Sequence, residues 1–194
     1  MASNDTEPYL YQLKYYMIVS LVLFIFFTMI GYFIAEYFQV NIIGEFADSF
    51  GFTLELDPFA LTLFIFLNNS VKSFFAILLG FFFAVVPLLF VTVNGFMIGI
   101  VFFDAVKEVG LAFILSAILP HGAIEIPVFL LSVAIGLRMG VQMVLKLDGR
   151  DVKLKSELKK GLRFFIFYIL PFFLISAFIE AFITPFFISI VIQL

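Results

Sequence analysis

The sequence contains no cysteine, no tryptophan and only one histidine, and just 13% of its 194 residues are charged. Without cysteine, the chain can form no disulfide and carries no thiolate chemistry. Without tryptophan, tyrosine must supply any belt of aromatic side chains at a membrane surface. The formal net charge of −3 is small, which argues against nucleic acid as a partner.

Hydrophobic residues, in contrast, make up 64% of the chain, and the mean hydropathy is +1.20. A soluble domain has about 45–50% apolar and about 25% charged residues. Uncharged stretches of about 20 residues recur, the length that an α-helix needs to cross a hydrocarbon core of about 30 Å. We therefore expect an all-α fold, a polytopic transmembrane helical bundle that forms a single membrane domain over residues 1–194.

The apolar runs predict about five membrane spans. They are expected at residues 15–35, 58–80, 84–103, 109–137 and 164–183, with a polar turn at residues 104–110. Proline removes a helical hydrogen bond and clashes with the preceding turn, so we expect Pro120 to break the fourth span and Pro171 to kink the fifth. Residues 185–194 form an apolar tail that could re-enter the bilayer as a short half-helix.

The charges predict an orientation. Residues 146–163 hold seven of the 11 cations, whereas residues 38–57 are acidic and contain neither lysine nor arginine. Because cytoplasmic loops carry an excess of positive charge, the basic loop is expected in the cytoplasm and the acidic loop outside. Counting spans between them places the N-terminal arm, residues 1–14, in the cytoplasm of a multi-pass protein of the cell membrane.

Several polar side chains interrupt the predicted spans. Asn68, Asn69, Asn94, His121 and Glu125 all fall near the bilayer midplane if each helix rises about 1.5 Å per residue. Unpaired polar groups are costly at that depth, so we expect the five to converge, with Glu180, on one buried polar cluster. The asparagines could instead join helices.

His121 and Glu125, four residues apart, share one face of a helix. They could form structural hydrogen bonds to the backbone N–H groups that lose their partners at Pro120. They could instead form part of a proton relay. A third possibility is that they bind a divalent metal such as zinc, with Glu180 as a third ligand. We expect Lys72 to pair with an acid or to extend its ammonium toward the membrane surface, and Arg138 to extend likewise near the cytoplasmic side.

The glycines predict close contacts between helices rather than phosphate-binding loops, because no strand precedes any of them. The glycines concerned are Gly80, Gly95, Gly99, Gly136 and Gly140.

These motifs resemble the stage II sporulation protein M family of integral membrane proteins. The resemblance rests on residues 120–127 (PHGAIEIP), on Asn68-Asn69 and Asn94-Gly95, on Gly136, and on residues 177–185 (AFIEAFITP). It covers the chain from about residue 58 to 185, and its most specific part is the His-Gly-x-x-Glu element. The resemblance implies a membrane-anchoring scaffold, because the family's namesake acts with two partner proteins in a complex that remodels peptidoglycan.

The leading functional hypothesis is therefore a non-enzymatic scaffold or assembly component of a membrane complex. Its expected partners are membrane lipid and other membrane proteins or a second copy of itself, as in a homo-oligomer. A transporter or channel for an ion or small solute is the first alternative, because broken helices commonly build such sites. An intramembrane metal-dependent hydrolase using His121, Glu125 and Glu180 is the second.

Overall fold

The computed structural model describes residues 8–41 and 56–192, and this part of the chain is helical without any strand. Five helical stretches are long and apolar enough to cross a membrane, which confirms the predicted class. The elements are α1 (Tyr9–Phe38), α3 (Pro58–Leu78), the 3-10 turn η2 (Leu79–Phe81), α4 (Val85–Val109), α5 (Leu111–Leu147), α6 (Leu154–Phe164), the π turn η3 (Phe165–Ile169), α7 (Leu170–Phe178), the π turn η4 (Ile179–Ile183) and α8 (Thr184–Ile192). Residues 1–7 of the predicted arm and 42–55 of the predicted acidic loop lie outside the described residues.

The first correction concerns the turn predicted at residues 104–110. α4 continues to Val109, and Gly110 alone separates it from α5. The φ angle of Gly110 is +84°, a backbone conformation that a residue without a side chain adopts at little cost. The polar side chains expected in a loop therefore belong to the last turns of α4.

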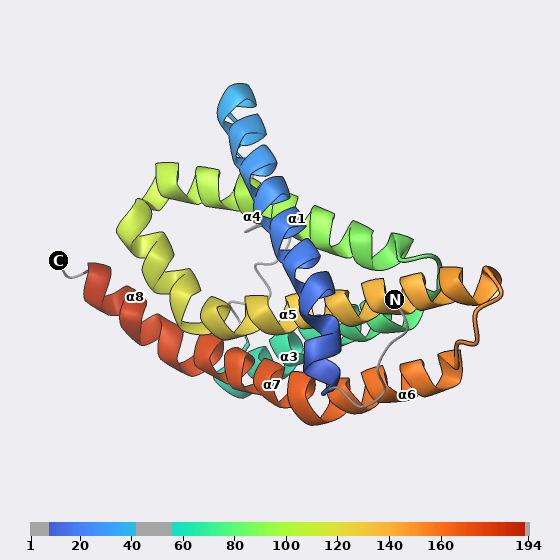
Figure 1. Ribbon diagram of the computed structural model, residues 1–194. Helices are drawn as coiled ribbons and strands as arrows, with labels where there is room; N and C mark the ends of the chain where they lie inside the picture. The colour runs from blue at the N-terminus through green and yellow to red at the C-terminus, as the bar shows by residue number, and fades with distance from the viewer. Residues whose placement is uncertain (1–7, 42–55, 193–194) are drawn as a thin grey trace.

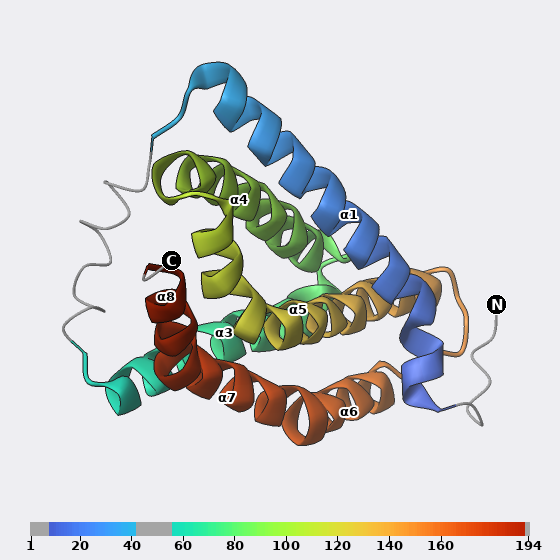
Figure 2. The same cartoon turned by 90° about the vertical axis from the view of Figure 1, so that its left-hand side faces the viewer.

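The fourth span also differs from its prediction. α5 runs without interruption through Pro120 and Pro127, and it bends sharply in its N-terminal half, as Figure 2 shows. Each proline removes one hydrogen bond, but the neighbouring turns keep theirs, so the helix bends instead of ending. The predicted break is thus absent, and Pro120 lies inside one continuous, bent helix.

The C-terminal half is more helical than predicted. The basic segment 146–163 is not a loop throughout, because α5 ends at Leu147 and α6 starts at Leu154. Helical structure then continues to Ile192 through the π turns η3 and η4, so the predicted tail extends the last helix. Pro171 lies directly after the π turn η3, so its missing N–H falls where the run changes from π to α hydrogen bonding.

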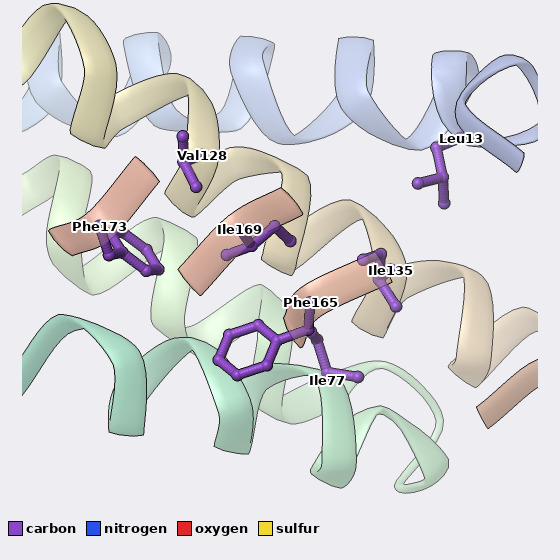
Figure 3. Close-up of a cluster of buried hydrophobic side chains, with 7 residues drawn as sticks. All are labelled: Leu13, Ile77, Val128, Ile135, Phe165, Ile169 and Phe173. Atoms are coloured by element: carbon purple, nitrogen blue, oxygen red, sulfur yellow. The ribbon is translucent and has the colours of Figure 1, made fainter. Parts of the chain in front are cut away.

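The bundle is arranged around α5. Helices α1 and α4 pack along each other on one side of α5, whereas α3 and the α6–α8 run lie on the other (Figures 1 and 2). A core cluster between α1, α3, α5, η3 and α7 is shown in Figure 3. The cluster contains Leu13, Ile77, Val128, Ile135, Phe165, Ile169 and Phe173.

Glycine lets the helix backbones meet. A β-carbon on Gly99 would overlap the carbonyl oxygen of Thr28, and one on Gly95 would lie 2.6 Å from the carbonyl oxygen of Phe24. α1 and α4 are therefore in backbone contact. Such contact supplies dispersion energy where lipid provides no hydrophobic drive.

Glycine also allows close backbone contact between α5 and the C-terminal end of α3 with the following turn η2. A β-carbon on Gly136 would overlap the carbonyl oxygen of Ala76, and one on Gly80 would overlap that of Gly136. These contacts confirm the packing role predicted for the glycines.

We expect Gly99→Ala to destabilise the fold by about 1–3 kcal/mol, because its new methyl group must push α1 away from α4. Gly122→Ala is the matched control, since the nearest atom to its methyl group is Cγ2 of Ile118, 3.1 Å away in the same helix. Circular dichroism melting in detergent should show a clear loss for Gly99→Ala alone. Equal melting temperatures for the two variants would refute backbone contact as the basis of this interface.

Candidate functional site

A polar cavity lies at the middle of the bundle, between α3, α4 and α5. Its volume is about 50 Å³, and it is partly open to the surface. Its polar lining comes from Asn69 and Lys72 on α3, Asn94 on α4 and Glu125 on α5, while phenylalanine and isoleucine side chains from α1, α4, α5 and α7 cover the remainder. A polar cavity needs about 10–15 Å³ to hold one water molecule, so this one has room for a few.

Helix geometry explains how these side chains meet. Asn69 and Lys72 are three residues apart, so both point from one face of α3. Asn69 faces the flank of α5 that carries Glu125, and the exposed Lys72 stands at the edge of the cavity. α3 and α4 make few contacts with each other, and the cavity occupies the space between them over α5.

Glu125 is the centre of the interactions in the cavity. The Asn69 amide and the Lys72 ammonium both lie close enough to its carboxyl group to interact with it electrostatically. One oxygen of this carboxyl group, Oε2, is buried and accepts no hydrogen bond from the described residues. Asn94 turns its amide nitrogen back to the carbonyl oxygen of Phe90, 2.7 Å away. The site therefore contains one carboxyl group with an oxygen that has no hydrogen-bond donor among the described residues, beside a cation and two amides.

Only part of the predicted cluster gathers here. Asn69, Asn94 and Glu125 line the cavity, whereas Asn68, His121 and Glu180 do not. Asn68 is exposed on the outer surface of α3. Glu180 lies in η4, half-buried and within the electrostatic reach of Glu125. The structure thus places three of the six residues at one cavity and the other three outside it.

His121 does not take the expected position. It is half-buried, and its Nδ1 is buried without a hydrogen-bond partner in the described part of the chain. Residues 8–41 and 56–192 contain no group of three His, Cys, Asp or Glu side chains arranged to hold a metal ion. The three-ligand zinc site of the hydrolase hypothesis is therefore not formed among them.

A second polar site, which the sequence did not predict, lies near the start of α1. Arg138 Nε donates to Glu157 Oε2 at 2.9 Å, and Arg138 Nη2 donates to Gln12 Oε1 at 2.8 Å. Lys160 Nζ is 3.4 Å from Glu157 Oε1. This network joins α5, α6 and α1 through side chains at one end of the bundle.

The network corrects the prediction for Arg138, which does not extend toward the membrane surface. Arg138 and Glu157 are both buried, with side-chain exposures of 5% and 8%. The sequence feature that could have indicated this pair is Glu157, the only acidic residue of α6. An acid among exposed lysines indicates a partner on another helix.

Comparison with known proteins identifies one family. The family model described as Stage II sporulation protein M matches residues 20–185. No curated protein matches the chain, and no solved structure does. The matched range includes the polar cavity and the Arg138–Glu157 pair.

We expect Glu157→Ala to cost about 3–5 kcal/mol, because it leaves the Arg138 guanidinium buried without its carboxylate. The double variant Arg138→Met/Glu157→Met should be more stable than Glu157→Ala, since no buried charge is left uncompensated. Asp148→Ala is the control, because it removes only an exposed pair with Arg150. Thermal melts in detergent test this order, and an equal effect of Glu157→Ala and Asp148→Ala would contradict it.

Proposed function

Because the chain belongs to the stage II sporulation protein M family, we propose that it is an assembly component of a membrane complex. In this proposal the outer face of α3 receives a transmembrane helix of a partner protein. The partner helix would carry an amide or carboxyl group at the depth of Asn68. The observation that carries the proposal is the exposure of Asn68 in the middle of a membrane span.

The free-energy cost of exposing the Asn68 amide to lipid supports a partner helix at this position. Asn68 is the eleventh residue of the 21-residue helix α3, so about 15 Å of helix lies on each side of it. At this depth lipid offers no hydrogen bond to an amide. An amide that finds a partner across two membrane helices contributes about 0.6–2 kcal/mol. A neighbouring polar helix would remove the penalty.

Lys72 is a second polar side chain on the exposed surface of α3, one helical turn after Asn68. It is exposed, lies four residues after Asn68, and stands at the edge of the polar cavity. Around the two polar groups the surface of α3 is apolar and exposed, as at Leu67 and Val71. An apolar face with a central amide and cation suits a transmembrane helix that presents an acceptor.

We also propose the predicted orientation, with the N-terminus in the cytoplasm of the cell. The connection between α5 and α6, the start of α1 and the turn between η2 and α4 lie at one end of the bundle (Figures 1 and 2). The ends of α4 and α8 lie at the other. Most cations lie at the first end, which favours the cytoplasmic side for it.

We expect a photo-crosslinking amino acid at position 68 to join the protein to one discrete partner in its native membrane. The matched control is position 22 on α1, because Val22 is equally apolar in its surroundings and is also exposed. Crosslinking at 68 but not at 22 supports the proposal. The variant Asn68→Cys identifies a second copy as the partner if it forms a disulfide-linked dimer, since the chain has no other cysteine.

Equal crosslinking at both positions, or none at either, would reject α3 as the assembly face. In that case the transporter or channel alternative gains weight if purified protein in liposomes passes an ion or small solute and Glu125→Gln stops the flux.

Single cysteines also test the orientation. Asp151→Cys lies in the connection between α5 and α6, and Glu108→Cys lies in the last turn of α4 at the opposite end; both side chains are exposed. A membrane-impermeant maleimide should label Glu108→Cys on intact cells. It should label Asp151→Cys only after the membrane is opened, and the reverse pattern would invert the orientation.

A further inference from the structure

We propose that α6 binds the headgroup phosphates of anionic phospholipids through a stripe of three cations. The stripe consists of Lys155, Lys159 and Arg163, which follow one another at intervals of four residues. That interval places all three on one face of the helix, and each is exposed. The proposal is independent of the assembly function, because α6 and the outer face of α3 are different surfaces.

The depth of the stripe supports a lipid ligand. α6 passes directly into η3 and α7, so the exposed apolar residues Ile166 and Phe167 follow Arg163 within one turn. Lys155 and Arg163 are separated by about 12 Å along the helix. The headgroup layer on each side of a bilayer is about 5–8 Å thick. Lysine and arginine side chains are long enough to reach phosphates from either end of the stripe.

The charge of the stripe is not neutralised within the described protein. Glu157, the acid of α6, points to the opposite side and is paired with Arg138 and Lys160. None of the three stripe residues forms an ion pair with any described residue. Their positive field is therefore available to an anion outside the protein.

Aromatic side chains complete a surface for the lipid. Phe164 at the end of α6 and Tyr168 in η3 are stacked, with ring centroids 4.8 Å apart, and Phe164 also contacts Tyr9 of α1 on the protein side. Tyr168 is exposed, and tyrosine favours the boundary between headgroups and acyl chains. An acyl chain can thus lie against the exposed Ile166, Phe167 and Tyr168 while its phosphate meets the cations.

The test uses purified protein in a neutral detergent, with its melting temperature measured after addition of phosphatidylglycerol or phosphatidylcholine. Phosphatidylglycerol should raise the melting temperature of the unchanged protein, whereas phosphatidylcholine should not. The triple variant Lys155→Gln/Lys159→Gln/Arg163→Gln should bind phosphatidylglycerol roughly 100-fold more weakly, since each cation near a membrane surface contributes about 1 kcal/mol. Its melting temperature without lipid reports whether it folds.

The matched control is Lys146→Gln/Arg150→Gln/Lys153→Gln, which removes three exposed cations around the connection between α5 and α6. Retained lipid stabilisation in this control, with loss in the stripe variant, supports the proposal. Equal loss in both variants would show a general charge effect and overturn it, as would retention in both. Stabilisation by inorganic phosphate alone, equal to that by the lipid, would overturn the assignment to a lipid headgroup.

Discussion

Backbone contact along α5 is the constraint on which the rest of the bundle depends. Between helices in lipid, apolar side chains gain little by leaving their surroundings, so association relies on close approach. Gly136 and Gly140 on α5 let α3 and the start of α4 come against its backbone, and Gly95 and Gly99 do the same between α4 and α1. α5 is thereby the most enclosed helix, and its flank is the floor of the polar cavity.

The polar groups divide into two kinds by their place in this bundle. Near the end at which α1 begins, Arg138, Glu157 and Gln12 satisfy one another and join three helices. At mid-depth, Glu125 keeps an unpaired oxygen, and Asn68 projects outward. A satisfied network fixes a fold, whereas unsatisfied groups retain the capacity to bind something else. This division separates the structural ion pair from the candidate site.

The sequence allowed the class, the five spans and the packing glycines to be predicted, because these depend on composition and local pattern. It also allowed the depth of each polar side chain in the membrane to be predicted, but not the side of the helix on which that side chain lies. Asn68 and Asn69 share a depth, yet about 100° of helix rotation separates them, and only one faces Glu125. Tertiary packing decides that angle. The burial of Arg138 was missed for the same reason, since its partner Glu157 lies on a helix predicted as part of a loop.

The two π turns determine which side of the last helical run faces α5. Each π turn amounts to one residue added to an α-helix, so η3 and η4 together rotate α8 by about 200° relative to an unbroken continuation of α6. The face of α8 that contacts α5 is therefore not the face that a 3.6-residue repeat drawn from Leu154 would present. Two single-residue insertions set which side chains of this helix meet protein and which meet lipid.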